Sequence, residues 1–158
     1  MQMEDRSPLV RRAAATDLEQ LLALYRELSD PPEQPGPPAG AEAEAALAAT
    51  LADPSRHLVV ATVNGEVVGT ADLLIVANLT HGARPWGIVE NVVVTHTHRG
   101  TGVGSAVLEH LIAIARQAGC YKVQLLSAKH RRNAHAFYRA IGFEPVAEGF
   151  KLYLEDEG

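Results

Sequence analysis

Residues 86–104 read WGIVENVVVTHTHRGTGVG, and this stretch decides the fold. The density of Val and Ile over residues 88–94 predicts a central strand of a sheet, because strands covered on both faces have such runs. Apolar side chains then recur at helical spacing over residues 102–118, which predicts a long amphipathic helix. A buried strand and a helix joined by a glycine-rich turn indicate an α/β fold.

The turn itself, RGTGVG at residues 99–104, has a pattern that suits phosphate. Glycines at alternate positions let backbone N–H groups point to one place, and the N-terminus of the following helix adds partial positive charge. Arg99 adds a permanent cation with several donors. A turn in which the glycines serve only the backbone geometry is the alternative. No Gly-Lys-Ser/Thr follows, so a Walker loop is excluded, and the glycine spacing disfavours a dinucleotide-binding enzyme.

Further elements are predicted on both sides of this stretch. Asn64-Gly65 between two β-rich runs predicts a tight hairpin of strands 57–63 and 66–76. Thr16 and Glu19 form a Ser/Thr-x-x-Glu capping box that should open a helix. The other predicted elements are strands at 8–14, 121–127, 145–146 and 150–154, a helix at 41–52, and a short helix capped by Asn133 and closed by Gly142.

Composition and charge exclude several classes of partner. The 158 residues are 47% hydrophobic and can enclose one core, so we expect a single domain over residues 5–155. With 19 acidic against 14 basic residues, the chain has no electrostatic footprint for nucleic acid. No apolar run is long enough to span a membrane, and the N-terminus lacks a signal pattern, so we expect a cytoplasmic protein without a membrane partner. The single cysteine, Cys120, excludes a disulfide framework, and His96 and His98 lack the partners of a metal site.

Two motifs resemble the GCN5-related N-acetyltransferase superfamily. RGTGVG matches its Arg/Gln-x-x-Gly-x-Gly/Ala signature through Arg99, Gly102 and Gly104. Downstream, NAHAFYRAIGF at residues 133–143 is similar to the Asn-containing region that closes with Gly-Phe. The stretches IVENVVV and GCYKVQLL are also similar to the glucosamine-phosphate N-acetyltransferase branch. The resemblance implies an acetyl-CoA-dependent N-acetyltransferase without a metal, with a mixed, mostly antiparallel sheet of roughly six to seven strands and about four helices.

The resemblance also implies where acetyl-CoA binds. Strands 88–95 and 121–128 would splay apart and leave a slot for the pantetheine arm, while the turn would hold the pyrophosphate. The second motif would face the cofactor. The candidate cofactor-binding residues are Val92, Val93, Val94, Arg99, Gly100, Thr101, Gly102, Val103, Gly104, Ser105, Asn133 and Phe137.

Glu90 is the candidate catalytic base. An alkyl ammonium has a pKa of roughly 10, so a base or a water relay must remove a proton before the amine attacks. Glu90 lies shortly before Val92 in an otherwise apolar strand, where we expect desolvation to strengthen it as a base. A structural carboxylate that pairs with an arginine or caps a backbone group is the alternative.

Tyr138 resembles the general acid of the family, which donates a proton to the coenzyme A sulfur as it leaves. A thiol has a pKa of about 8.5 and a phenol a pKa of about 10, so the phenol can serve if it is held close. Solvent could protonate the thiolate instead. Packing beside Phe137 is the alternative role for the ring.

The acceptor is expected to be a small polar amine, held in a ternary complex by loops 29–40 and 77–87. A phosphorylated sugar would need cations, and the candidates are Arg84, His81 and the basic run 129–132. The resemblance also favours a homodimer, because homodimers are common in this superfamily. Two alternatives stay open: a coenzyme A-binding regulatory module without turnover, and an acetyltransferase of protein or peptide amines.

Overall fold

The computed structural model describes residues 6–28 and 39–154. The chain forms two compact units, Met1–Leu125 and Leu126–Gly158. The first contains the whole sheet and three α-helices, and the second contains one α-helix. The assignment of residues 5–155 to one acetyltransferase domain stays a prediction.

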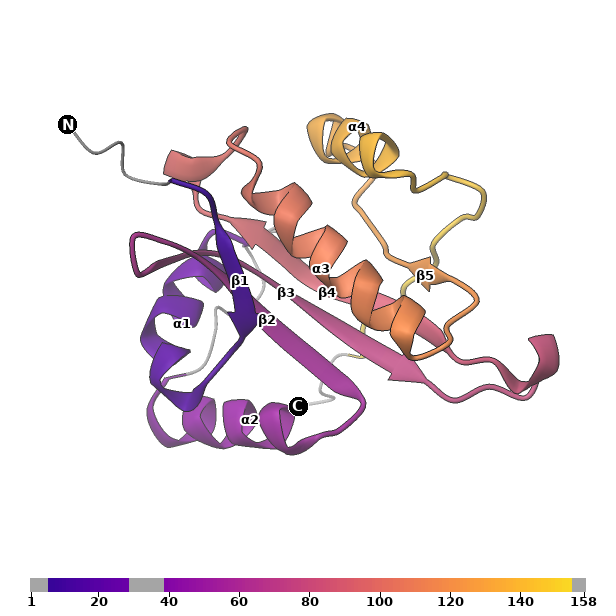
Figure 1. The fold of residues 1–158 in the computed structure, drawn as a ribbon, viewed down its shortest axis with the longest axis horizontal. Helices are drawn as coiled ribbons and strands as arrows, with labels where there is room; N and C mark the ends of the chain where they lie inside the picture. Colours follow the sequence, from indigo (N-terminus) through magenta and orange to yellow (C-terminus); the bar gives the residue numbers. More distant parts are fainter. Residues whose placement is uncertain (1–5, 29–38, 155–158) are drawn as a thin grey trace. The chain divides into compact units, whose positions relative to one another are not determined.

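The sheet of the first unit has five strands in the order β1-β2-β3-β4-β5 (Figure 1). Neighbouring strands are antiparallel except β4 and β5, which are parallel, so the predicted mixed, mostly antiparallel sheet is confirmed. The hairpin at Asn64-Gly65 is also confirmed, and both residues have the positive φ that a tight turn requires. The strands are β1 (Leu9–Arg12), β2 (Arg56–Val63), β3 (Glu66–Val76), β4 (Trp86–Val94) and β5 (Val123–Gln124).

Four α-helices accompany the strands in the described part of the chain, as the sequence predicts. They are α1 (Leu18–Arg26), α2 (Gly40–Ala52) and α3 (Val103–Gln117) in the first unit, and α4 (Arg132–Ile141) in the second. Short 3-10 turns lie at η1 (Ala15–Asp17), η2 (His81–Ala83) and η3 (His96–His98).

Helix α3 covers one face of the sheet (Figure 1). Its residues Val107, Leu108 and Leu111 are at most 1% exposed. The contact with β3 is close at Gly69, where a Cβ would lie 2.8 Å from the Cγ1 of Val103. Glycine at position 69 therefore lets the start of α3 approach the sheet.

Helices α1 and α2 pack on the other side of the sheet. They bring Leu21, Leu24 and Leu47 into one buried cluster with residues of the strands. The strand residues include Leu58 and Val60, which alternate with residues on the α3 face. The sheet is thus covered on both faces, as the apolar composition of its strands indicates.

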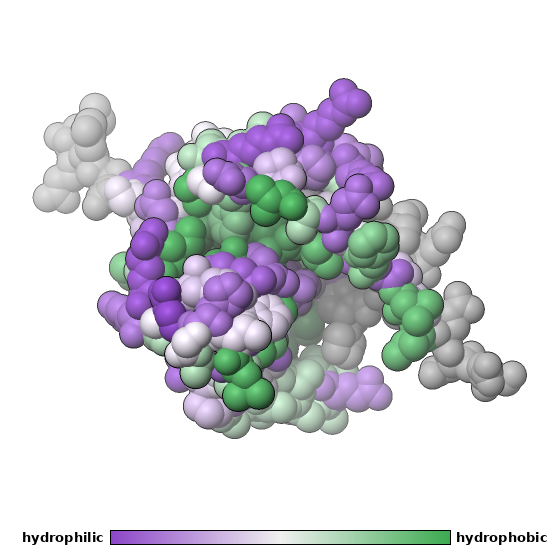
Figure 2. Space-filling view, turned by 90° about the vertical axis from the view of Figure 1, so that its right-hand side faces the viewer, coloured by the Kyte–Doolittle hydropathy of each residue, from purple (hydrophilic) through white to green (hydrophobic). Residues whose placement is uncertain are grey.

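The prediction of two final strands at 145–146 and 150–154 is wrong. The described residues after Ile141 contain no strand, so the sheet has five strands and not six to seven. Val146, Phe150 and Leu152 are more than 80% exposed, and hydrophobic residues are visible at the surface in Figure 2. Alternating apolar side chains suit a strand, but a strand is stable only when a neighbour accepts its backbone hydrogen bonds. The prediction of a strand at 121–127 is likewise too long.

The helix caps also differ from the predictions. The first helical turn begins at Ala15, and its start is held by Asp17 and not by Thr16. Asp17 accepts a hydrogen bond from the N–H of Ala14 (2.7 Å) and two from Arg11 (2.8 Å each), because its side chain is buried beside that guanidinium. The hydrogen bonds from Arg11 lower the pKa of Asp17. In the second unit the N-cap of α4 is Arg131, so the predicted cap at Asn133 is wrong.

Candidate active site

A β-bulge interrupts β4 next to Glu90. In the register with β3, Asp72 faces Glu90 and Thr70 faces Val93, so two residues of β4 lie opposite one residue of β3. Asn91 takes the extra position with φ of 53°, a left-handed conformation that Asn tolerates better than most residues. Because of the bulge, the side chains of Glu90 and Val93 lie on the same face of the sheet, the face of α1 and α2.

The pairing between β4 and β5 is short. It consists of Gly87 with Val123 and Ile88 with Gln124, after which β4 pairs only with β3 as far as Val94 among the described residues. The slot that the resemblance implies between β4 and β5 stays a prediction. The expected contacts of Val92, Val93 and Val94 with pantetheine stay a prediction.

The glycine turn has the backbone that its sequence predicts. Gly100 and Gly102 have φ of 74° and 90°, and apart from the adjoining residues no described atom lies within 4 Å of where a Cβ would be at either position. Gly102 is the N-cap of α3, and its carbonyl accepts the first helical hydrogen bond from Ala106 (3.1 Å). No side chain caps this helix, so the N–H groups of its first turn, at Val103, Gly104 and Ser105, are available to an anion.

Arg99 and His96 are held in place by Glu27 at the end of α1. The Nε of Arg99 donates to the carbonyl of Val94 (3.1 Å), and its guanidinium lies 3.7 Å from Glu27. Glu27 also accepts a hydrogen bond from the N–H of His96 (3.0 Å), whose Nδ1 lies 3.1 Å from the same oxygen. Burial raises the pKa of Glu27, whereas hydrogen bonds from His96 and Thr95 lower it. The hydrogen bonds together outweigh burial, so the pKa lies below its ordinary value. This ion pair joins α1 to the glycine turn.

The predicted desolvation of Glu90 is wrong. Its side chain is exposed, as is that of Asn91, although β4 is otherwise at least half buried. The physical reason is incomplete cover: on this face of the sheet Val93 packs in the cluster with α1 and α2, whereas Glu90 is left open to solvent. A role for Glu90 as a base therefore does not depend on an apolar environment.

A pocket lies on the face of the sheet under α1 and α2. Polar groups of β2, β3 and β4 line one part of it, including Arg56, Asp72 and Asn91. The Nε of Arg56 donates to Asp72 (3.3 Å), and a second, closer contact joins its terminal nitrogen to the other carboxylate oxygen. We call this the α1–α2 pocket; its lining residues are Leu18, Leu21, Leu22, Tyr25, Ala43, Ala46, Leu47, Thr50, Arg56, Leu58, Asp72 and Asn91.

Sequence reasoning missed this pocket. None of the residues 77–87 lines it, and the other predicted acceptor loop falls mostly on residues 29–38, outside the described residues. Asp72 was the available signal, since it is an acid in the apolar run of β3 and needs a partner when buried.

The second unit carries the other motif. The Tyr138 ring lies 5.3 Å from that of Phe137 and 6.0 Å from that of Phe143, the latter edge-on. Burial raises the pKa of Tyr138, and the charge of Arg131 opposes this in part. Asn133 is exposed in the first turn of α4. The roles predicted for Asn133, Phe137 and Tyr138 stay predictions.

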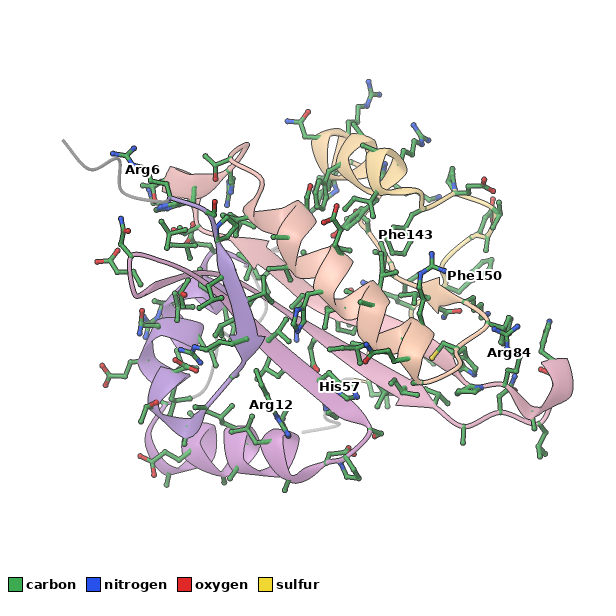
Figure 3. The ribbon with its side chains drawn as sticks, viewed as in Figure 1. Arg6, Arg12, His57, Arg84, Phe143 and Phe150 are labelled. Carbon is green, nitrogen blue, oxygen red and sulfur yellow. The ribbon has the colours of Figure 1, made fainter. Side chains whose placement is uncertain are left out.

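Two of the cations considered for a sugar phosphate have structural contacts. Arg84 donates to the carbonyl oxygens of Gly119 (3.2 Å) and Cys120 (3.1 Å), and Figure 3 shows its side chain near the beginning of β4. The ring of His81 stacks on Tyr121, with centroids 3.9 Å apart. Both residues hold the loop before β4, at the opposite end of that strand from the bulge and the glycine turn.

Neither a metal cluster nor a membrane span is found in the described ranges. Over residues 6–28 and 39–154, no three His, Cys, Asp or Glu side chains come together as metal ligands. No helix in that part of the chain is both long and apolar enough to cross a membrane.

Comparison with known proteins adds a family to this geometry. The acetyltransferase (GNAT) family matches residues 21–143, which include the bulged strand and the glycine turn. The chain belongs to this family. GNAT acetyltransferases use acetyl-CoA, and the residues of the turn fit its pyrophosphate through free N–H groups and positive-φ glycines.

Individual relatives agree with the family. A glucosamine 6-phosphate N-acetyltransferase of Trypanosoma brucei brucei is 35% identical over 145 residues, covering 88% of this chain and 90% of the relative. An aminoglycoside N(6')-acetyltransferase of Stenotrophomonas maltophilia is 30% identical and covers 94% and 95%. A solved structure from Agrobacterium tumefaciens superposes with a TM-score of 0.86 at 44% identity, covering 92% and 99%. This GNAT protein is an N-acetyltransferase, similar in part to the glucosamine-phosphate branch.

Proposed function

We propose that this acetyltransferase transfers an acetyl group from acetyl-CoA to the amine of a small molecule, directly within a ternary complex. One observation carries the proposal: β4 borders the α1–α2 pocket at its bulge and leads to the glycine turn through Val94 and the η3 turn. An acceptor in the pocket and a cofactor on the turn would then share one strand. The two relatives with small-molecule acceptors in their names support this reading.

Glu90 accepts the proton of the acceptor amine in this proposal, directly or through water. It stands next to Asn91, which lines the pocket, and opposite Asp72, which also lines it. A carboxylate is a much weaker base than an alkyl amine, so Glu90 relies on proximity to take up the proton that the ammonium or the attacking nitrogen gives up during the reaction. A water between Glu90 and the amine suits the exposure of this side chain.

Tyr138 protonates the departing thiolate in the same proposal. Its raised pKa keeps the phenol protonated over the whole neutral range, so the proton is present when the thiolate forms. Acetyl-CoA supplies the acetyl group as a thioester. The proposed binding residues at β4 and the turn hold the cofactor by backbone groups and by the positive end of α3.

Release of free thiol from acetyl-CoA in the presence of a panel of amines tests the function. We expect Glu90→Gln to lower kcat/KM by about 10²-fold near neutral pH, with the exposed Glu109→Gln as its control. Tyr138→Phe should lower kcat, while Tyr153→Phe, 61% exposed in the same unit, should not. Coenzyme A bound tightly by a protein that acetylates no amine would instead support a regulatory module.

The cofactor site has its own matched pair. Gly102 and Gly65 both have positive φ and open space at the Cβ position, so alanine costs about 1 kcal/mol of backbone strain at each. Only Gly102→Ala should weaken coenzyme A binding in calorimetry. Equal binding by both variants would place the cofactor elsewhere.

Location and assembly complete the proposal. We propose a cytoplasmic protein that forms a homodimer and has no nucleic-acid or membrane partner. Light scattering on the full chain measures the mass in solution, and a mass of one chain would exclude the homodimer.

A further inference from the structure

The charges that line the α1–α2 pocket cancel. Arg56 is the one cation among its described lining residues, and Asp72 is the one anion. They form an ion pair with two contacts, and the side chain of Asp72 is only 5% exposed. Among the described lining residues, a ligand therefore meets no unpaired charge.

The other polar groups of the pocket are neutral. The hydroxyl of Thr50 donates to the carbonyl of Ala46 (2.9 Å), within its own helix. Burial raises the pKa of Tyr25, as does the charge of Asp72, so the phenol is uncharged. The rest of the lining is Leu or Ala except for Asn91, the exposed amide at the bulge. Hydrocarbon thus makes up most of the wall.

Strand β4, which lines the pocket through Asn91, adds no cation. Glu90, on the strand beside Asn91, contributes a further negative charge. A phosphate group needs several cationic donors to replace its water, and the described lining residues of the pocket offer no cation outside the Arg56–Asp72 ion pair.

We propose that the α1–α2 pocket takes a primary amine carried on an uncharged, mostly hydrocarbon body. The inference rests on the proposed function and names the class of its acceptor. The hydrocarbon body lies against the leucines of α1 and α2, which removes apolar surface from water. The ammonium stays at the end of the pocket near Asn91 and Glu90, where the charge is negative. Phosphorylated aminosugars and polycationic aminoglycosides are poor acceptors, because their extra charges have no partner there.

A panel of primary amines tests this on the full chain. Phenethylamine and hexylamine represent the proposed class, and glucosamine 6-phosphate and kanamycin represent charged bodies. Thiol release gives kcat/KM, and saturation-transfer NMR with coenzyme A present gives binding without turnover. We expect the first two amines to exceed the others by at least about tenfold in both measurements.

A charge added to the wall should reverse this preference. Leu22 is half buried on α1 and lines the pocket, whereas Leu79 is 96% exposed in the loop between β3 and β4. Leu22→Lys should raise the kcat/KM ratio of glucosamine 6-phosphate to phenethylamine by about tenfold or more. Leu79→Lys should leave the ratio unchanged, and equal thermal melting of both variants confirms that they fold.

The outcomes separate the inference from the function. Binding of phenethylamine without acetylation of any amine would refute the proposed function and uphold the pocket chemistry. Faster acetylation of glucosamine 6-phosphate than of both uncharged-body amines would overturn the inference while the function stands, and would point to the basic run Lys129–Arg132. Failure of every amine to bind would also overturn it.

Discussion

At Gly69, on the face of the sheet that α3 covers, a single added methyl group would come within 2.8 Å of Val103. On the opposite face, the side chains of Leu18 and Leu22 stay half buried around a pocket. Both faces belong to the same strands and carry similar apolar residues. The difference lies in the helices, since one long helix fills its face whereas two shorter helices leave a space between them and the sheet.

This difference assigns separate tasks to the two faces. Close packing under α3 fixes the start of that helix, and with it the N–H groups of the glycine turn. The face under α1 and α2 has its own buried cluster but keeps room for a ligand beside it. Stability should therefore depend more on the leucines under α3 than on the half-buried leucines of the pocket wall, and acceptor choice on the pocket wall.

The largest expected effect is the loss of a core leucine under α3. Leu108 is 0% exposed, so Leu108→Ala should reduce the free energy of unfolding by about 2–5 kcal/mol. The matched change Leu22→Ala, on a half-buried leucine of the pocket wall, should cost only about 1 kcal/mol. Urea unfolding of both variants measures the two values. Equal losses would mean that the two faces do not differ in packing.

Replacing a small residue by a larger one should also destabilise the protein more under α3 than at the pocket. Gly69→Ala forces Val103 to move and should destabilise the protein by about 1–3 kcal/mol. Ala46→Leu adds more atoms on the pocket side of α2, yet stability should change by less than about 0.5 kcal/mol. The acceptor KM of Ala46→Leu should rise, because the new side chain occupies the pocket. Thermal melting and steady-state kinetics check the pair, and an unchanged acceptor KM in Ala46→Leu would argue against this pocket as the acceptor site.

The smallest effect concerns Glu27, which joins α1 to the glycine turn. Its pKa is lower in the folded protein than in the unfolded chain, so ionised Glu27 stabilises the fold above the unfolded pKa of about 4.3. This contribution, less than about 1 kcal/mol, is lost as the pH falls through the lower folded pKa. Melting curves of the parent and Glu27→Gln should differ near pH 7 and converge as the pH falls through the lowered folded pKa of Glu27. A constant difference at every pH would show that the charge of Glu27 is not responsible.

The sequence predicted correctly the turns whose backbone conformation is set by their own residues. Asn64-Gly65 specifies its hairpin through backbone preferences alone, and the glycine turn does the same before α3. The strands at 145–146 and 150–154 failed because alternation describes a side-chain pattern and says nothing about the partner strand.

The candidate site shows the same division. Consecutive residues were enough to predict the cofactor turn. The α1–α2 pocket, in contrast, forms where Arg56, Asp72 and Asn91 come together from three different strands. The bulge at Asn91 was also invisible, since an Asn in a valine-rich run looks like an ordinary polar position. The expected desolvation of Glu90 was wrong because the helices that cover its face come from a distant part of the sequence and leave the carboxylate exposed.

The left-handed backbone of Asn91 restricts which residues variation can introduce there. In a randomised library at position 91, folded variants should be enriched in Asn, Asp and Gly, because β-branched and bulky residues are strained at φ of 53°. Position 91 lines the pocket but can therefore offer the acceptor only a small set of side chains. Positions 22 and 46 are on regular helices, whose backbone accepts most residues other than Pro and Gly. Divergence in acceptor specificity should thus accumulate on α1 and α2, while the strand that carries Glu90 changes slowly.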